Sequence, residues 1–359
     1  MSEPKLSRLL HGKGAAGGFP VAGNFELTPR CNFNCRMCYV HLSAGEQRSR
    51  GEELSTEQWL RLGEEACRAG TVFLLLTGGE PTLRQDFPEI LSGLKRMGLL
   101  ISVNSNGYLL RGELLRRVLA DPPHRFNITL YGSSDETYEA LCGVPAYETV
   151  LANIRALREA GVDVRVNITV APENAGELEA IEARARELGA HAQMCAYLFP
   201  PVRVRGWQAF FDRLPPEEAA RLEARRLRRS LRPEELEAMR RNLSLPREND
   251  ECGYCRSARS SFWLSWDGRL MPCGMLAEPA ADAAKLGFAA AWARVRDAVR
   301  LLEYPETCRS CRYRELCHIC LAKCWCETGG FERPPEYPCR MTRALLRELE
   351  IPCDREVLS

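Results

Sequence analysis

The feature that most constrains the fold is an alternation of strand-like and helix-like segments between residues 20 and 200. Six apolar runs are typical of strands: residues 24–28, 71–79, 99–107, 125–132, 162–170 and 191–199. Helix-prone segments separate them, among them one long stretch from 135 to 161. Repeated strand–helix units require parallel strands with helical crossovers. We therefore predict an α/β fold, a partial (β/α)6 TIM-like barrel with its chemistry at the carboxyl ends of the strands.

Polar or glycine-rich turns follow the first four predicted strands. A cysteine-rich loop follows the first strand, GGEP (78–81) the second, NSNG (104–107) the third and LYGSS (130–134) the fourth. Because the carboxyl ends of parallel strands meet at one rim, we expect these four turns to converge on one mouth.

Composition excludes several classes of protein. The formal net charge of +1 favours neither nucleic acid nor an anionic membrane as a partner. The first 20 residues lack the apolar core of a signal peptide, and no run approaches the roughly 20 apolar residues of a membrane span. We predict a cytoplasmic protein that binds neither nucleic acid nor membrane.

The seventeen cysteines indicate metal or thiol chemistry, because disulfides are rare in a reducing compartment. They are unevenly placed: three lie within residues 31–38 and eleven within 252–353. Only Cys67, Cys142 and Cys195 are scattered between, and buried thiols are common as small core residues.

The segment TPRCNFNCRMCYV sets Cys31, Cys35 and Cys38 in the spacing C-x3-C-x2-C. Three thiolates can hold three irons of a four-iron cluster and leave the fourth iron open for a ligand. A zinc knuckle is the alternative, with His41 as its fourth ligand.

The GGEP turn would complement such a centre. Gly78 and Gly79 permit close backbone approach to a ligand, Glu80 offers a carboxylate to a cationic group, and Pro81 stiffens the turn. A GGEP turn some fifty residues beyond a three-cysteine loop, within a strand–helix array, favours iron over zinc.

Together, the cysteine segment and GGEP resemble the radical S-adenosylmethionine (radical SAM) enzymes. The resemblance implies that Cys31, Cys35 and Cys38 bind a catalytic [4Fe–4S] cluster whose open iron chelates the amine and carboxylate of S-adenosylmethionine. Reductive cleavage then gives a 5′-deoxyadenosyl radical that abstracts a substrate hydrogen. The cofactor-binding residues implied in this way are Met37, Gly78, Gly79, Glu80, Pro81, Asn106 and Thr129.

Two positions depart from the family pattern. Met37 stands where an aromatic residue is common, so only a backbone contact to adenine is expected from it. Cys142 stands where many relatives carry an arginine, and recognition of the cofactor carboxylate must then come from elsewhere.

The C-terminal cysteines resemble the SPASM extension of this family. The segment CRSARSSFWLSWDGRLMPC is followed by a C-x2-C-x5-C-x2-C run, by ETGG and by Cys339. The resemblance implies two auxiliary [4Fe–4S] clusters, and three clusters in all. The first auxiliary set is Cys252, Cys255, Cys273 and Cys320, and the second is Cys308, Cys311, Cys317 and Cys339.

Other uses of these cysteines stay open. The same C-x2-C pairs would suit two zinc-ribbon sites. Cys324 and Cys326 are additional thiols that would replace Cys320 or act as reactive groups, and Cys353 is not expected to be a ligand.

These patterns predict five segments: an N-terminal extension (1–20), a radical SAM partial barrel (21–200), a charged helical linker (201–250), a small cysteine-rich SPASM domain carrying the auxiliary clusters (251–345) and a tail (346–359). The linker interleaves arginine with glutamate, which favours a solvated helix over an RNA-binding strip.

The resemblance implies an oxidoreductase that cross-links or oxidises a ribosomally synthesised precursor peptide. Its partners would be that peptide and a flavodoxin- or ferredoxin-type reductant. Only 30 residues precede Cys31, so we expect a separate protein, or the linker and mouth, to grip the leader of the peptide.

A sulfatase maturase, a small-molecule radical oxidase, and a zinc-binding interaction module on an inactive barrel are the alternatives. Gly274 stands where sulfatase maturases carry an acidic residue, and this disfavours the first of them.

Overall fold

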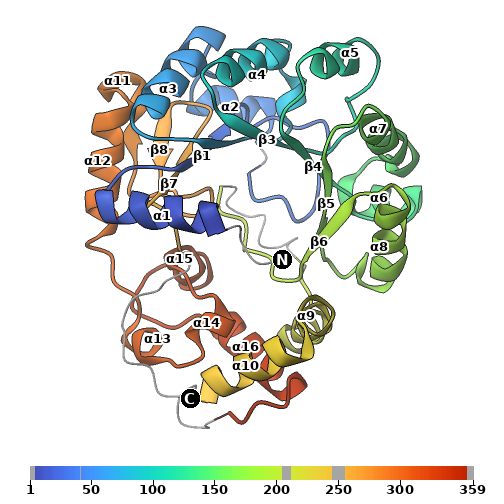
Figure 1. The fold of residues 1–359 in the computed structure, drawn as a ribbon, viewed down its shortest axis with the longest axis vertical. Helices are drawn as coiled ribbons and strands as arrows, with labels where there is room; N and C mark the ends of the chain where they lie inside the picture. The colour runs from blue at the N-terminus through green and yellow to red at the C-terminus, as the bar shows by residue number, and fades with distance from the viewer. Residues whose placement is uncertain (1–4, 41, 204–211, 245–254, 354–359) are drawn as a thin grey trace.

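The computed structural model describes residues 5–40, 42–203, 212–244 and 255–353 (Figure 1). Within these residues, one nine-stranded sheet has the order β6-β5-β4-β3-β2-β1-β7-β8-β9. Strands β1 to β6 are parallel throughout and form the predicted partial barrel. Their bounds are β1 Ala22–Glu26, β2 Phe73–Thr77, β3 Leu100–Ser105, β4 Arg125–Thr129, β5 Val164–Thr169 and β6 His191–Cys195. All six predicted strands are therefore confirmed, each close to its apolar run.

Burial alternates along β3, β4 and β5 with the period of two that a pleated strand imposes. One face is apolar and fully buried, as Val103, Ile128 and Val166 show. On the other face Asn104 and Asn127 are half-buried and joined by a side-chain hydrogen bond of 2.9 Å. The barrel thus has an apolar outside, covered by helices, and a polar inside.

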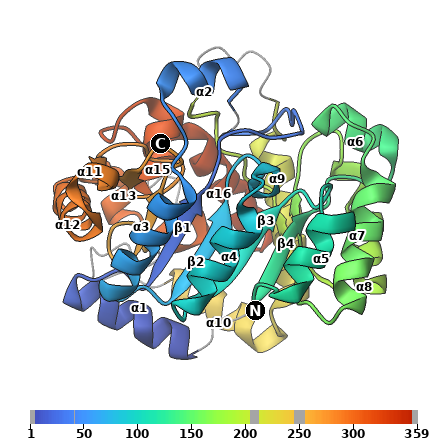
Figure 2. The same cartoon turned by 90° about the horizontal axis from the view of Figure 1, so that it is seen from above.

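Helices α3 to α8 cover the outer face of the sheet, and Figure 2 shows α3, α4 and α5 in front of the strands. Their bounds are α3 Thr56–Arg68, α4 Phe87–Arg96, α5 Gly112–Ala120, α6 Asp135–Cys142, α7 Tyr147–Glu159 and α8 Leu178–Glu187, with short 3-10 turns at Pro81–Leu83 and Ala175–Glu177. Ser55 begins α3 with a capping box that includes Gln58.

The single helical stretch predicted over 135–161 is wrong, because α6 and α7 are separate helices. Gly143 ends α6 in the left-handed conformation, with φ of 72°, and donates its N–H to the Glu139 carbonyl. Pro145 follows and cannot continue a helix. A break at this point turns the end of α6 toward the cysteine loop.

The cysteine-rich C-terminal part joins the barrel through its sheet. Strand β7 (Ser261–Leu264) pairs in parallel with β1, and the antiparallel strands β8 (Arg269–Met271) and β9 (Ala281–Asp282) extend the sheet further. A Cβ atom on Gly23 of β1 would lie 2.1 Å from the Phe262 ring, so glycine permits this pairing. The predicted boundary at residue 251 therefore falls between segments that share one sheet.

The remaining helices are α1, which precedes β1, α2, which follows the cysteine loop, and α9 to α16, which follow β6 in the chain. Helices α13 to α16, with α9 and α10, lie opposite β3 and close the ring between β6 and β7 (Figure 1). The bounds are α1 Lys5–Gly17, α2 Ala44–Arg50, α9 Pro216–Ser230, α10 Pro233–Ser244, α11 Ala283–Leu286, α12 Phe288–Val299, α13 Glu306–Ser310, α14 Arg314–Cys317, α15 Leu321–Thr328 and α16 Glu336–Glu348. In the described part of the chain, no helix has both the length and the apolarity that a membrane crossing needs.

Candidate active site

The three cysteines of the C-x3-C-x2-C segment lie on the loop that follows β1. Backbone hydrogen bonds hold this loop against the last turn of α6: the N–H groups of Asn34 and Arg36 donate to the carbonyls of Cys142 and Leu141, both at 2.9 Å. A helix leaves its last carbonyls without intrahelical partners, so the end of α6 supplies ready acceptors. The loop is thereby positioned by a helix far away in the sequence.

The thiols on this loop act on one another electrostatically. Burial raises the pKa of Cys31 most, and the charges of Glu80, Cys35 and Cys38 raise it further. The pKa of Cys35 is raised first by a hydrogen bond with the thiol of Cys142. Cys142 is fully buried, so the structure packs a fourth sulfur against the loop. Ionising these thiols together requires a compensating positive charge, which is what a bound metal supplies.

The carboxylate of Glu80 is fully buried and surrounded by donors. Its Oε1 accepts hydrogen bonds from the Thr82 N–H at 3.1 Å, the Thr82 hydroxyl at 2.6 Å and the Ser105 hydroxyl at 2.9 Å. Its Oε2 accepts one from the Asn106 N–H at 2.7 Å. Burial raises the pKa of Glu80, although the hydrogen bonds from these residues oppose the shift. None of the described Lys, Arg or His side chains lies within ion-pair distance of this carboxylate.

The glycines before Glu80 are required by the chain itself. A Cβ atom on Gly78 would lie 2.5 Å from the Thr28 carbonyl oxygen, and one on Gly79 would lie 2.3 Å from the Arg30 carbonyl oxygen. The N–H groups of Gly79 and Glu80 donate to those same two carbonyls at 2.8 Å. The GGEP turn is therefore bonded directly to the start of the cysteine loop.

Asn106 joins the same two segments through its side chain. Its Nδ2 donates to Asn32 Oδ1 at 2.9 Å and lies 3.7 Å from Cys31 Sγ, while its Oδ1 accepts from the Tyr108 N–H. The turns after β1, β2 and β3 thus form one hydrogen-bonded unit, as the predicted convergence requires.

The other predicted cofactor residues lie around this unit. Met37 is buried in the core, and Pro81 begins the 3-10 turn Pro81–Leu83. Thr129 ends β4 half-exposed, with its carbonyl accepting from the Tyr138 hydroxyl at 3.2 Å. His41 and Cys252 lie outside the described residues.

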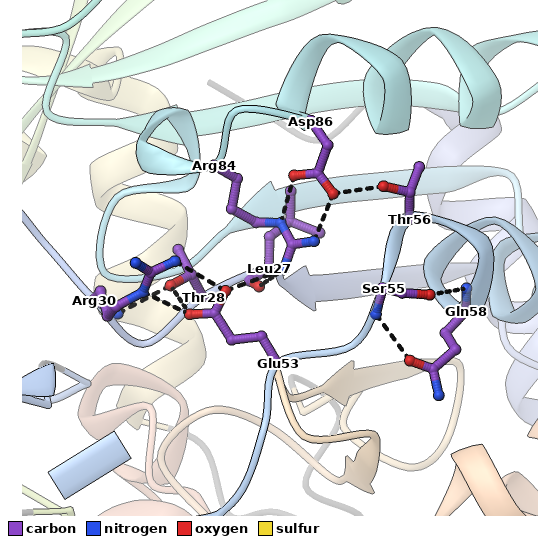
Figure 3. A network of polar contacts seen from close by, with 9 residues as sticks. All are labelled: Leu27, Thr28, Arg30, Glu53, Ser55, Thr56, Gln58, Arg84 and Asp86. Atoms are coloured by element: carbon purple, nitrogen blue, oxygen red, sulfur yellow. Dashed lines mark hydrogen bonds and ion pairs between the residues drawn. The ribbon is translucent and has the colours of Figure 1, made fainter. Parts of the chain in front are cut away.

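A polar network braces the outside of this unit (Figure 3). Arg84 is buried and donates to Glu53 at 3.1 Å and to both carboxylate oxygens of Asp86 at 2.9 and 2.7 Å. Glu53 also accepts from Arg30 and from Thr28 at the start of the cysteine loop. Arg84 therefore ties the segment after GGEP to the segment before Cys31.

Replacing Arg84 with methionine is expected to destabilise the fold by about 3 kcal/mol, because two partly buried carboxylates lose their shared cation. Urea denaturation of the anaerobic protein measures this change. The matched variant Arg116→Met, which breaks the exposed pair with Glu113, should leave the midpoint nearly unchanged. Equal midpoints for the two variants would show that the network does not brace the loop.

The C-terminal cysteines fall into two neighbourhoods. In the first, the charges of Cys320 and Cys255 act on Cys273, whose pKa burial raises to about 11. Cys326 belongs here too: its pKa is raised to about 12 by burial and then by Cys273 and Cys320. Its Sγ donates to the Met275 carbonyl at 3.4 Å, two residues beyond Cys273. Cys320 caps the first turn of α15, where its Sγ accepts from the Lys323 N–H at 3.4 Å.

The second neighbourhood contains the other predicted ligands. Burial raises the pKa of Cys308 to about 12, followed by the charges of Cys339, Cys317 and Cys311. Cys324 is fully buried and packs in one apolar cluster with Cys308. Among the described residues, no three His, Cys, Asp or Glu side chains meet closely enough to hold a single metal ion. A four-iron cluster places each cysteine on a different iron, so its ligands need not meet at one point.

Comparison with known proteins identifies the family. The Radical SAM superfamily profile matches residues 25–185, which include the end of β1, the cysteine loop, GGEP and strands β2 to β5. A probable GTP 3',8-cyclase from Aeropyrum pernix is 32% identical over 268 residues, 69% of this chain and 71% of that protein. The protein belongs to the radical SAM superfamily.

Two further similarities cover nearly all of this radical SAM enzyme. An AdoMet-dependent heme synthase from Methanosarcina barkeri is 27% identical over 340 residues, 87% of this chain and 94% of the relative. The crystal structure of Streptococcus suis SuiB has the same fold, with a TM-score of 0.69 and 16% identity over 92% of this chain and 82% of SuiB. SuiB has also been crystallised with S-adenosylmethionine and with its precursor peptide SuiA. The family's chemistry uses S-adenosylmethionine and a [4Fe–4S] cluster.

Sequence reasoning did not identify several residues that build this site. Ser105 and Thr82 stand beside predicted residues, but only the folded chain aims their hydroxyls at Glu80. Arg84 follows GGEP by three positions, and its partner Glu53 lies 31 residues earlier. Proximity in sequence could have suggested Ser105 and Thr82, whereas no local pattern indicates the Arg84–Glu53 contact.

Proposed function

We propose that Cys31, Cys35 and Cys38 hold the catalytic [4Fe–4S] cluster and that the enzyme oxidises or cross-links a side chain of a ribosomally made peptide. When bound, the cluster supplies the electron that cleaves S-adenosylmethionine to the 5′-deoxyadenosyl radical. Glu80 receives the amine of S-adenosylmethionine. Asn106 keeps the Glu80 turn in register with the cysteine loop, and Met37 and Thr129 line the adenine and ribose side.

The observation that carries this proposal is the buried, uncompensated carboxylate of Glu80 beside the three-cysteine loop. A buried carboxylate is costly unless a cation and hydrogen bonds satisfy it. Glu80 has the hydrogen bonds, and its Oε2 accepts only one from the described residues, so an acceptor position remains there. An α-amino group beside the cluster would supply the missing positive charge.

The peptide substrate is supported by the shared fold with SuiB, a protein crystallised with a precursor peptide. The structure also bears on the sulfatase-maturase alternative. A Cβ atom at Gly274 would lie 2.9 Å from the Trp263 ring, whose Nε1 donates to Glu26. The indole thus occupies the space that an acidic side chain at position 274 would need, which disfavours that alternative.

A small-molecule radical oxidase is the second candidate. The observation in its favour is the similarity to the heme synthase, which extends over 87% of this chain and 94% of that relative.

Anaerobic reconstitution tests the catalytic part of the proposal. The reduced protein is expected to convert S-adenosylmethionine to 5′-deoxyadenosine, and to contain roughly twelve iron atoms per chain if both auxiliary sites hold four-iron clusters. Two zinc atoms per chain and no cleavage would support the zinc-module alternative instead. Peptides encoded beside the gene are the substrates to assay, with mass spectrometry to detect a loss of hydrogen.

We also propose that Cys326 completes the first auxiliary site with Cys255, Cys273 and Cys320. The variant Cys326→Ser is expected to lose about four iron atoms per chain. Cys67→Ser, which alters a half-buried thiol of α3, should retain its iron. If Cys252→Ser loses this iron and Cys326→Ser keeps it, the fourth ligand is Cys252, as the resemblance to the SPASM extension implies.

A further inference from the structure

A cavity of about 950 Å³ runs along β6, between the open edge of the sheet and the C-terminal helices. All five residues of β6 line one side of it, and residues of α9, α14 and α16 line the other. β6 ends the sheet order, so one side of its backbone has no strand to pair with among the described residues. An extended peptide can add to such an edge by main-chain hydrogen bonds.

The cavity is more positively charged than the protein as a whole. Its lining contains five Arg or Lys side chains and two Glu, a net charge of +3 (5 − 2), whereas the whole chain carries +1. Three of the arginines are already paired: Arg125 with Asp163 at 2.6 Å, Arg226 with Glu223 and Arg229 with Glu182 at 2.8 Å.

The other two cations, Arg165 and Lys323, have no carboxylate within ion-pair distance among the described residues. Arg165 donates to the amide oxygen of Gln193 at 3.2 Å. Lys323 donates to the Cys317 carbonyl at 2.8 Å and lies 4.6 Å from the centre of the Tyr197 ring. Burial lowers the pKa of Arg165, the neighbouring charge of Arg125 lowers it further, and the charge of Asp163, which is paired with Arg125, raises it only in part.

Arg165 lies beside the first half of β6, and Lys323 lies beyond its last residue. Arg165 pairs in register with His191, the first residue of the strand, and Lys323 lies over Tyr197, two residues beyond its end. Tyr197 stands six positions after His191 and four after Gln193, the residue that accepts from Arg165, so four to six positions separate the two charges, a span of about 13 to 20 Å in extended chain. The far end of this span lies at the rim where the cysteine loop and GGEP also lie, because β1 to β6 are parallel.

We propose that the cavity binds an extended segment of the substrate peptide along β6, with two acidic residues four to six positions apart held by Arg165 and Lys323. This deepens the proposed function, since it rests on a peptide substrate. A peptide fits better than a haem, whose two carboxylates lie together on one edge of the ring and do not reach both cations.

Fluorescence anisotropy tests the proposal with a labelled Ser/Thr peptide of about ten residues, whose two glutamates stand about six positions apart. We call it the wide-spaced acidic peptide. Anaerobically reconstituted protein is titrated without S-adenosylmethionine, so the result does not depend on radical chemistry. Two control peptides are matched to it: a neutral one with glutamine in place of both glutamates, and a close-spaced one whose glutamates are separated by a single residue.

We expect the wide-spaced acidic peptide to bind at least about ten-fold more tightly than the neutral peptide and than the close-spaced peptide. Arg165→Gln and Lys323→Gln should each weaken its binding about ten-fold, because each removes one of the two cations. Arg116→Gln on α5 removes an exposed arginine far from the cavity lining and should not change it.

Several results would overturn the proposal: no binding of the wide-spaced acidic peptide, equal binding of the acidic and neutral peptides, or an equal loss in Arg116→Gln. Binding of haemin in place of the peptide, lost in Arg165→Gln, would also overturn it and favour the small-molecule candidate. Circular dichroism checks that each variant is folded, and the two variants on separate elements keep the test decisive if one of them unfolds. Peptide binding without 5′-deoxyadenosine formation would instead count against the catalytic proposal alone.

Discussion

Replacing Cys35 with alanine is expected to reduce 5′-deoxyadenosine formation by at least about a thousand-fold and to remove roughly four iron atoms per chain. Cys35 lies in the middle of the three-cysteine loop, and two thiolates cannot hold the catalytic cluster in place of three. Chromatography of the reduced reaction measures the product, and iron analysis measures the loss of the cluster.

Two comparisons make this result specific to the catalytic cluster. Cys67→Ala removes a thiol of similar size from α3 and should keep both iron and activity. The thiol of Cys142 contacts Cys35, so the double variant Cys35→Ala/Cys142→Ala shows whether Cys142 rescues the site. If Cys35→Ala cleaves S-adenosylmethionine as fast as the parent protein, the assignment of these three ligands is wrong.

Replacing Glu80 with glutamine is expected to weaken S-adenosylmethionine binding by about 2 kcal/mol, roughly thirty-fold in Kd. The change removes the negative charge that the cofactor amine would meet. It also turns an amide N–H₂ toward groups that are themselves donors, such as the Asn106 N–H. Isothermal calorimetry on the iron-loaded protein measures the affinity.

Glu177→Gln is the matched control, because Glu177 also accepts hydrogen bonds from neighbouring N–H and hydroxyl groups, those of Ser133 and Thr137. It lies outside the hydrogen-bonded unit of the first three turns and should leave the affinity unchanged. Equal losses in Glu80→Gln and Glu177→Gln would mean that the effect is structural, and unchanged binding in both would exclude Glu80 from the cofactor site.

The same carboxylate predicts a pH dependence. Burial raises the pKa of Glu80, so it takes up a proton at higher pH than an exposed glutamate does. The ionised form is the one that pairs with the amine, and binding should therefore weaken as pH falls through this raised pKa. Calorimetry across mildly acidic and neutral pH should show the loss in the parent protein and not in Glu80→Gln.

Local sequence patterns predicted the barrel and the position of its site. Apolar runs and intervening helices marked all six barrel strands, because burial on a sheet and on a helix leaves different periods in the sequence. One helix boundary was wrong: the prediction for residues 135–161 missed that Gly143 and Pro145 break the segment there. That error matters for the site, because the carbonyl groups at the end of α6 hold the cysteine loop in place.

The spacing of cysteines and the GGEP turn determined, by themselves, the family and the rim at which we propose its chemistry takes place. Only the tertiary structure decided that β7 joins β1 in one sheet, that Arg84 braces Glu53, that Cys326 contacts Met275 close to Cys273 and that a cationic cavity follows β6. The reason is physical: periodicity and turn chemistry act between residues close in the chain, and they are written in the local sequence. Contacts between distant segments depend on how whole elements pack, and no local pattern encodes them.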